Sequence, residues 1–236
     1  MSTDADLARI REAYERYAAD PRELRRRDER NRGLMRLMRE WHDALLAELA
    51  ARGLLRSSVR VLDAGCGNGW LLARLAEAGV ERSGLHGIEL IPERVAAARA
   101  KVPGAAIVEG SAHDMPYPDA SFDVVCLAMV LSSIRSSEMR RHVADECRRV
   151  LAPCGVIACY ELRWVRPSNR EVEALTSDDV GMLFGGMERS VRTLSLVPPL
   201  ARRLGPTTRW LYRPLASLPV LRSRHLTILS APASPC

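Results

Sequence analysis

The amino-acid sequence predicts an α/β protein with a doubly wound, mostly parallel β-sheet. Three observations carry this prediction: short apolar runs alternate with amphipathic segments from residue 59 to 160, a glycine-rich turn follows the first run, and the run FDVVCLAMV is apolar almost without alternation. Strands that alternate with helices of roughly 10–15 residues form parallel sheets covered on both faces. A strand that is apolar on both sides belongs in the middle of such a sheet.

The first half of this unit contains three expected strands. Residues 59–62 form the first strand, and the segment WLLARLAEAGV after the glycines has its leucines at helical spacing. LHGIEL is the second strand and ends near Glu89, after which Pro92 opens a helix at a position that tolerates proline. AAIVEG is the third strand.

The second half continues the alternation. FDVVCLAMV is the fourth strand, and the helix after it is capped by Ser136 or Ser137. GVIACY is the fifth strand, and HLTILS near the end is a candidate last strand. Two helices rich in arginine and glutamate are expected in residues 4–52, with a break at Asp20-Pro21.

Composition places the chain among globular proteins. Of 236 residues, 47% are hydrophobic and 27% are charged, which is enough apolar material for a sizeable core. The net charge is +6, carried almost entirely by arginine, since Lys101 is the single lysine. A basic balance can indicate a nucleic-acid or acidic partner. The arginines form no single block along the chain, which favours ordinary surface charge.

Neither a targeting segment nor a membrane span is recognisable. The N-terminus is charged and lacks the apolar stretch of a signal peptide, and no segment approaches the roughly 20 apolar residues of a span. The six cysteines show no zinc spacing, and several lie in apolar runs, where thiols behave as small buried hydrophobes. These features predict a soluble cytoplasmic protein with no metal site and no membrane partner.

The glycine-rich turn VLDAGCGNGW indicates the ligand. Its spacing is G-x-G-x-G, and Trp70 stands where a dinucleotide site needs its third glycine. No Lys-Ser/Thr pair follows, so the turn is not a P-loop. Asp63 at its mouth would repel a phosphate. The expected ligand therefore approaches the backbone closely, lacks phosphate and carries positive charge. S-adenosylmethionine, with its sulfonium and ammonium groups, has these properties.

VLDAGCGNG resembles the first motif of class I S-adenosylmethionine-dependent methyltransferases. Four further stretches resemble that family in the same order: GIEL, EGSAHDMPYPDASFDVV, LAMVLSSI and ECRRVLAPCGVIA. The resemblance covers residues 59–160 and implies a Rossmann-like fold with S-adenosylmethionine as the cofactor. The segments outside this range resemble the family only faintly.

The resemblance also implies a set of cofactor-binding residues. Glu89 would accept hydrogen bonds from both ribose hydroxyls, and Ser111 and Ala112 would meet the adenine edge, with Ser111 standing where an acid is usual. The full expected set is Tyr14, Asp63, Gly65, Cys66, Gly67, Asn68, Gly69, Glu89, Leu90, Ser111, Ala112 and Leu127. A purely structural interpretation stays open, in which the glycines serve turn geometry and Glu89 favours the start of the next helix.

The family resemblance divides the chain into an N-terminal helical lid (residues 1–52) and a Rossmann-like domain (residues 53–236). Within the domain, residues 161–222 would be a substrate-side elaboration that roofs the site. Stretches such as YELRWVRPSNREV and LVPPLARRLG resemble, more loosely, type 11-like methyltransferases of bacterial glycan and small-molecule pathways. Apolar side chains of this region could wall a pocket or form a homodimer contact.

The expected reaction is O-methylation of a small hydroxylated acceptor, a sugar or a natural-product alcohol or phenol. The Asn/Asp-Pro-Pro-Tyr motif of base-modifying methyltransferases is absent, and so is a basic and aromatic appendage, which disfavours nucleic acid. Glu161 and His113 are the candidate catalytic bases, and each could equally be structural. The alternatives are N- or C-methylation, a non-catalytic cofactor-binding regulator, and a different enzyme on the same fold.

Overall fold

The computed structural model describes residues 3–26, 28–165 and 171–231. Residues 166–170, which belong to the stretch YELRWVRPSNREV, therefore lie outside the described residues.

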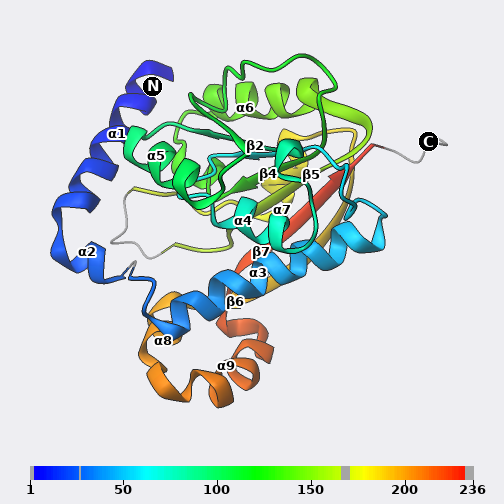
Figure 1. The fold of residues 1–236 in the computed structure, drawn as a ribbon. Coiled ribbons are helices and arrows are strands. Elements are labelled where there is room, and N and C mark those ends of the chain that lie inside the picture. The colour runs from blue at the N-terminus through cyan, green and yellow to red at the C-terminus, as the bar shows by residue number, and fades with distance from the viewer. Residues whose placement is uncertain (1–2, 27, 166–170, 232–236) are drawn as a thin grey trace.

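Within the described ranges, the strands form one seven-stranded sheet in the order β3-β2-β1-β4-β5-β7-β6 (Figure 1). The first five strands along the chain run parallel, β7 pairs antiparallel with β5, and β6 pairs antiparallel with β7. The mostly parallel, doubly wound sheet confirms the predicted fold class. The strands are β1 (Val61–Ala64), β2 (Leu85–Glu89), β3 (Ala106–Glu109), β4 (Phe122–Ala128), β5 (Leu151–Leu162), β6 (Glu188–Leu196) and β7 (Arg222–Ser230).

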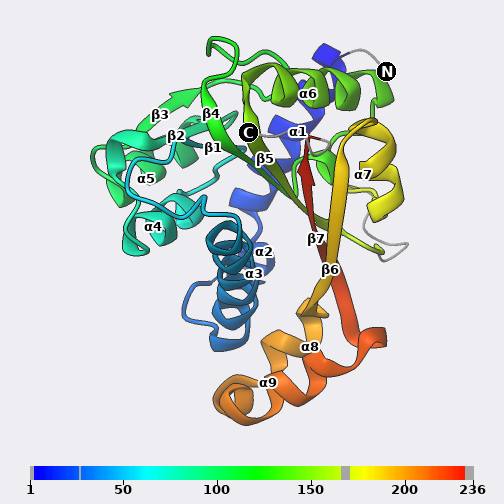
Figure 2. The same ribbon diagram turned by 90° about the vertical axis from the view of Figure 1, so that its right-hand side faces the viewer.

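Helices cover both faces of the sheet (Figures 1 and 2). On one face, α3 (Arg32–Ala51), α4 (Trp70–Glu77) and α5 (Pro92–Lys101) pack in a single apolar cluster. On the other face, α6 (Ser137–Val150) and α7 (Ser177–Leu183) form a second cluster. Because β1 and β4 lie between the two layers, their side chains are buried on both sides, as the unbroken apolar run FDVVCLAMV predicts.

Local sequence signals explain where these helices begin. The side chain of Ser136 accepts a hydrogen bond from Met139 N at 3.2 Å, which confirms the predicted cap of α6. Asn31 caps α3 by accepting a bond from Leu34 N at 3.0 Å. Pro92 occupies the first turn of α5, as expected.

The two predicted N-terminal helices are α1 (Thr3–Ala19) and α3, and the chain breaks at Asp20-Pro21 as predicted. A short third helix, α2 (Pro21–Arg26), lies between them and was not expected. Figure 1 shows α1 and α2 along one side of the sheet, away from the C-terminus. None of the helices in the described part of the chain has the length and apolar character that a bilayer crossing requires.

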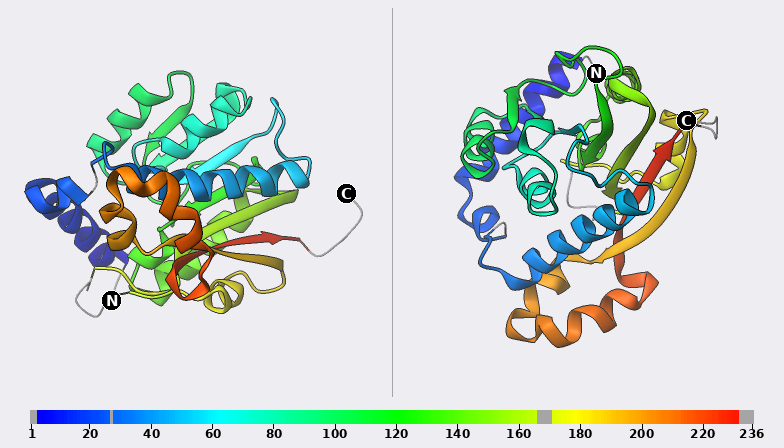
Figure 3. Two further views of the ribbon diagram at one scale, coloured as in Figure 1. Left: turned by 90° about the horizontal axis from the view of Figure 1, so that it is seen from below. Right: turned by 45° about the vertical axis from the view of Figure 1, so that its right-hand side comes forward.

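The region after β5 differs from expectation because it contributes a strand to the sheet. ERSVRTLSL forms β6, an edge strand whose first half is exposed, so its sequence lacks the apolar run of a buried strand. Between β6 and β7 lie α8 (Pro198–Arg203) and α9 (Thr208–Ser217), which form a lobe at one end of the sheet beside α3 (Figure 3). We call residues 197–221 the C-terminal lobe.

The C-terminal lobe is attached firmly to α3. Leu37 of α3 shares an apolar cluster with Tyr212 and Ala216 of α9. Gly33 permits the close approach of α8, since a Cβ atom at this position would overlap the carbonyl oxygen of Ala201. The lobe is therefore part of the folded body.

Candidate functional site

The glycine turn lies where β1 ends. Gly65, Gly67 and Gly69 all have positive φ, at 83°, 54° and 76°. Gly65 N and Cys66 N both donate to the carbonyl oxygen of Ile88, at 2.7 and 3.1 Å, which ties the turn to β2. A Cβ atom on Gly65 would lie 2.5 Å from Val130 Cγ2, so a residue with a side chain would clash with Val130 at this position. The glycines therefore satisfy a real conformational requirement, and they also keep this edge of the sheet open to close contact.

Glu89 closes the other side of the turn. Its carboxylate is nearly fully buried and accepts hydrogen bonds from Gly67 N at 2.8 Å and from Ile91 N at 3.0 Å. One oxygen thus supports the glycine turn and the other supports the start of α5. The structure places Glu89 directly against the predicted cofactor loop, as the family resemblance implies.

Asp63 is a buried carboxylate with an unused acceptor. Its Oδ1 receives no hydrogen bond from the described residues, although the side chain is buried. Burial, together with the nearby charge of Glu89, raises the pKa of Asp63 to about 7, and the positive charge of Arg94 opposes this shift. A buried, unpaired carboxylate is costly unless a cation or donor satisfies it. The ammonium group of S-adenosylmethionine would do so, which means that Asp63 and the glycine turn fit the predicted cofactor.

Arg94 is a site residue that the sequence did not predict. Its Nη1 lies 3.7 Å from Glu89 Oε2, and its guanidinium carbon lies 4.7 Å from the centre of the Tyr14 ring. A Cβ atom on Gly67 would lie 2.7 Å from Arg94 Nη2. Arg94 therefore links Tyr14 of α1 to the glycine turn. The only sequence signal was its place in the first turn of α5, five residues after Glu89.

Helix α1 is held against the body by Asp6. The Asp6 carboxylate is buried and accepts bonds from Arg135 N at 2.9 Å and Ser136 N at 2.6 Å, at the start of α6. Arg9 bonds to the same carboxylate at 2.8 Å and to the carbonyl oxygen of Ser133 at 2.5 Å. Although burial raises the pKa of Asp6, the bonds from Ser136, Arg9 and Arg135 outweigh it and lower the pKa overall. This contact anchors the predicted lid.

Replacing Asp6 by Ala is expected to release α1. Hydrogen bonds to a charged group contribute about 1.5–3 kcal/mol, so local opening of α1 should become roughly 10–100-fold more frequent. Trypsin cleavage within α1, at Arg11 and Arg16, measures this opening, and Asp4→Ala is the matched control because Asp4 is exposed in the same helix. Equal cleavage of the two variants would contradict the anchoring role.

Acid should release α1 in the same way in the unsubstituted protein. Asp6 has a lowered pKa when folded, so its contribution is present above the ordinary value of 3.8 and is lost as the pH falls through the folded value.

The segment after β4, residues 129–134, is held from several sides. Met129 has a positive φ of 63°, and its N–H donates to the carbonyl oxygen of Tyr160 at 2.8 Å. Glu161, fully buried at the end of β5, accepts bonds from Leu131 N at 2.9 Å and Ser132 N at 3.2 Å. Strained backbone that the surroundings hold in place is a frequent property of functional sites. This segment is the last six residues of LAMVLSSI, the stretch that resembles the family's substrate-facing stretch.

These contacts change the interpretation of Glu161. Burial raises its pKa to about 7, while the bonds from Ser132 and Leu131 act in the opposite direction. Both oxygens accept from backbone N–H groups and the side chain is fully buried, so the carboxylate is closed off from an acceptor's hydroxyl. The geometry favours a positioning role for Glu161 over the predicted role of general base.

The remaining predicted residues are distributed around the same edge. His113 Nδ1 lies 2.7 Å from Ser111 Oγ, which places the second candidate base beside a residue expected at the adenine edge. Ala112 is buried in the α6-side cluster, and so is Leu127, whose side chain faces the core. The Cys66 side chain also faces inward, toward Gly87, so a cofactor would meet its backbone. Asn68 and Leu90 are half-buried at the turn and after β2.

Comparison with known proteins identifies this central segment. Residues 62–159 match the family model described as "Methyltransferase domain". This segment is therefore similar to the methyltransferase domains of that family. Its cofactor is S-adenosylmethionine, in agreement with the glycine turn and the fit at Asp63.

Curated relatives share this domain. The 27-O-demethylrifamycin SV methyltransferase of Amycolatopsis mediterranei is 37% identical over 142 residues, which cover 58% of this chain and 51% of that protein. A demethylmenaquinone methyltransferase of Chlorobaculum tepidum is 33% identical over 116 residues, covering 49% of this chain and 45% of that protein. The chain thus spans about half the length of the curated relatives it matches.

Solved structures share the fold over most of the chain. The [4+2]-cyclase SpnF superposes with a TM-score of 0.58 at 20% identity, covering 81% of both chains. A SAM-dependent methyltransferase from Archaeoglobus fulgidus gives a TM-score of 0.56 at 14% identity and covers 80% of this chain and 94% of that one. The first of these is named as a cyclase, so the fold alone does not determine the reaction.

Proposed function

We propose that this chain catalyses S-adenosylmethionine-dependent methyl transfer to a small hydroxylated acceptor, a sugar or a natural-product alcohol or phenol. The observation that carries the proposal is the buried, unpaired oxygen of Asp63 beside a glycine turn that Glu89 supports. This combination favours a ligand with a cationic end and a hydroxyl-bearing ring. The methyltransferase domain over residues 62–159 supports the same reaction class.

The residues present assign roles at the cofactor. Asp63 would accept from the ammonium group, and the turn at Gly65–Gly69 would admit the body of the cofactor against the backbone. Glu89 would accept from the ribose hydroxyls, with the guanidinium of Arg94 beside its carboxylate. When bound, S-adenosylmethionine supplies an electrophilic methyl group. Transfer is an in-line displacement, and much of its rate comes from holding the acceptor in line with that group.

Replacing Glu89 by Ala should weaken binding of S-adenosylmethionine by roughly 10–100-fold, because bonds to a charged group contribute about 1.5–3 kcal/mol. Isothermal titration calorimetry with the cofactor and with S-adenosylhomocysteine measures the loss. Glu93→Ala is the matched control, because Glu93 is an exposed acid in the first turn of α5, the helix whose start Glu89 supports. If Glu89 acted only on the helix start, the two variants would bind equally.

An oxygen acceptor is the first candidate because the relative from Amycolatopsis mediterranei is named for a 27-O-demethyl substrate, 27-O-demethylrifamycin SV. C-methylation is the second candidate, since several relatives with 27–35% identity are named demethylmenaquinone methyltransferases. Both substrate classes are small molecules. Residues 129–134, which Glu161 and α1 hold in place, are the proposed wall facing the acceptor, with the C-terminal lobe and α1 on either side.

Transfer of labelled methyl groups in a fractionated bacterial extract tests the acceptor class. We expect label in the small-molecule fraction, and NMR of the product distinguishes a methyl group on oxygen from one on carbon. Asp63→Asn protein is the control for cofactor-dependent transfer. Label found only in protein or RNA would overturn the proposal of a small acceptor.

The need for a base depends on the acceptor. If a hydroxyl must lose its proton in the transition state, His113 is the remaining predicted base, and His113→Gln should lower turnover by ~10²–10⁴ without changing cofactor affinity. A smaller loss would indicate that His113 only orders the loop around Ser111.

A further inference from the structure

The C-terminal lobe exposes an unusual amount of apolar surface. In the part of the chain that the structure describes, half of the exposed large hydrophobic side chains lie within residues 210–220. They are Trp210, Leu211, Leu218 and Val220, with exposed fractions of 68%, 46%, 48% and 81%. Exposed apolar groups gathered in one place indicate an interaction surface, whereas scattered ones are ordinary.

The charged side chains of the sequence after Glu188 are all positive. The sequence contains no Asp or Glu after Glu188, and this final stretch carries eight arginines, while residues 1–188 together have a net charge of −2. Arginines occur along the whole chain, whereas every acid lies within residues 1–188. The positive net charge of the protein is therefore a property of its C-terminal region.

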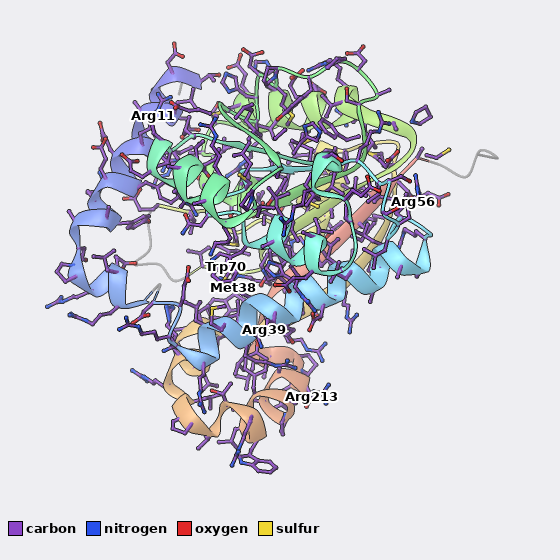
Figure 4. The ribbon with its side chains drawn as sticks, in the orientation of Figure 1. Arg11, Met38, Arg39, Arg56, Trp70 and Arg213 are labelled. Carbon is purple, nitrogen blue, oxygen red and sulfur yellow. The ribbon has the colours of Figure 1, made fainter. Side chains whose placement is uncertain are left out.

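A second group of arginines faces the lobe from α3. Arg32, Arg36 and Arg39 line an open groove together with Arg209 and Arg213 of α9; Figure 4 labels Arg39 and Arg213 on the two elements. Among the described residues, none of these five forms an ion pair with an acid. Two acids at the groove form hydrogen bonds with aromatic side chains instead.

Those two acids are Glu29 and Glu40. Glu40 accepts a bond from Tyr212 Oη at 2.6 Å, and Glu29 accepts one from Trp70 Nε1 at 3.1 Å. The arginine charge in the groove is therefore available to an external anion.

Helix geometry orders these groups. Thr208, Tyr212 and Ala216 form the buried stripe of α9, so Trp210 projects from the opposite side of the helix. Arg209 and Arg213 lie between the two, on the side that lines the groove. Arg209 also lies 4.9 Å from the Trp210 ring. An apolar ridge flanked by arginine is the arrangement of a helix that lies in a membrane interface.

We propose that the surface formed by α9, residues 218–220 and the arginines of α3 docks on an anionic membrane surface. Trp210 and the aliphatic side chains would enter the boundary between headgroups and acyl chains, and the arginines would contact lipid phosphates. The sequence predicts no membrane partner because it contains no span. A contact with the membrane surface needs exposed apolar side chains. Which side chains of residues 208–220 are exposed follows from how α9 packs on α3, and the sequence alone does not show this packing.

Two other partners fit the surface less well. A symmetric dimer would place this patch against its own copy, so the arginines of one protomer would face those of the other. Single-stranded nucleic acid is bound by aromatic side chains on which bases stack, whereas three of the four exposed apolar residues here are aliphatic.

Co-sedimentation of the full chain with vesicles tests the proposal. At low ionic strength, we expect binding to vesicles of phosphatidylcholine with a quarter phosphatidylglycerol and little binding to phosphatidylcholine alone. Arg209→Gln with Arg213→Gln should reduce the partition coefficient about 25-fold, at roughly fivefold per arginine. Trp210→Ala should reduce it about tenfold. Arg141→Gln with Met182→Ala is the matched control, because both residues are exposed on the α6 and α7 side.

A spectroscopic measurement checks the orientation. Trp210 emission should shift to the blue on addition of anionic vesicles, and the shift should be absent in Trp210→Ala. Equal binding of variants and control, or binding to a single-stranded oligonucleotide in preference to vesicles, would overturn the proposal. So would a dimer in sedimentation velocity that the Trp210 variant abolishes. These measurements need no cofactor or acceptor, so their outcome is independent of the proposed enzymatic function.

Discussion

Replacing Asp63 by Asn is expected to stabilise the ligand-free protein at pH 8 and to remove most of its affinity for S-adenosylmethionine. Burial and the charge of Glu89 raise the pKa of Asp63 to about 7 from 3.8. Ionising such a group in the folded protein costs roughly 4 kcal/mol relative to the unfolded chain. Asn has the same shape and no charge, so it relieves this cost. It also removes the charge that would pair with the cofactor's ammonium group.

The sign of the pH dependence follows from the raised pKa. Below pH 3.8 the carboxyl is protonated in both states and costs nothing; the penalty grows as the pH rises and is complete above about 7. The gain in unfolding free energy from Asp63→Asn should therefore be near zero at pH 4 and largest at pH 8. Cofactor affinity of the unsubstituted protein should fall below pH 7, because protonation removes the charge that binds the cation.

Chemical denaturation at several pH values and calorimetric titration of the cofactor measure the two effects. Asp114→Asn is the control, because Asp114 is exposed in a loop. An Asp63→Asn protein that is less stable at pH 8, or that binds the cofactor normally, would show that Asp63 is a structural acid.

Replacing Glu161 by Ala is expected to destabilise the protein, with a larger loss at pH 5 than at pH 8. The substitution leaves the N–H groups of Leu131 and Ser132 without their partner, and each buried, unpaired donor costs about 1–3 kcal/mol. At pH 5 the total of roughly 2–5 kcal/mol corresponds to a decrease in Tm of roughly 5–15 °C. At pH 8 the loss is smaller because the variant no longer ionises a carboxyl whose pKa is about 7 in the folded state.

Thermal unfolding at the two pH values distinguishes the roles of Glu161. A carboxylate kept only as a base would leave stability at pH 5 unchanged when removed. Glu109→Ala, which removes an exposed acid from β3 at an edge of the same sheet, provides the comparison. A positioning residue gives the pH-dependent loss, and it lowers turnover by loosening residues 129–134.

The part of the site that was predictable from sequence is local. The glycine turn, Asp63 and Glu89 lie at the ends of two strands that the pattern of apolar runs predicts, and parallel strands bring their carboxyl ends to one edge. The N-terminal break and the cap at Ser136 were predictable for the same reason, since each depends on a few neighbouring residues.

What the sequence could not predict depends on contacts between distant residues. Glu161 reads as a candidate base at a strand end, but the backbone of Leu131 and Ser132, about thirty residues earlier, decides its role. From the sequence, Arg94 resembles an ordinary surface arginine of a helix. Its role at the site depends on Tyr14, eighty residues earlier, whose ring lies against its guanidinium group. The sequence did not predict β6, because the first half of this edge strand is exposed and its sequence therefore lacks the continuous apolar run of a buried strand.

The attachment of the C-terminal lobe has a consequence for how this protein can change. The lobe leaves the sheet at Leu196 and returns at Arg222, and these two residues are paired partners in the antiparallel ladder. Val197 N also donates to the carbonyl oxygen of Leu221 at 2.9 Å, so the ladder closes the base of the insertion. The free energy of closing a loop grows slowly with its length. The twenty-five residues between these ends can therefore change in length without shifting the register of the sheet, provided that the packing of α8 and α9 on α3 is kept.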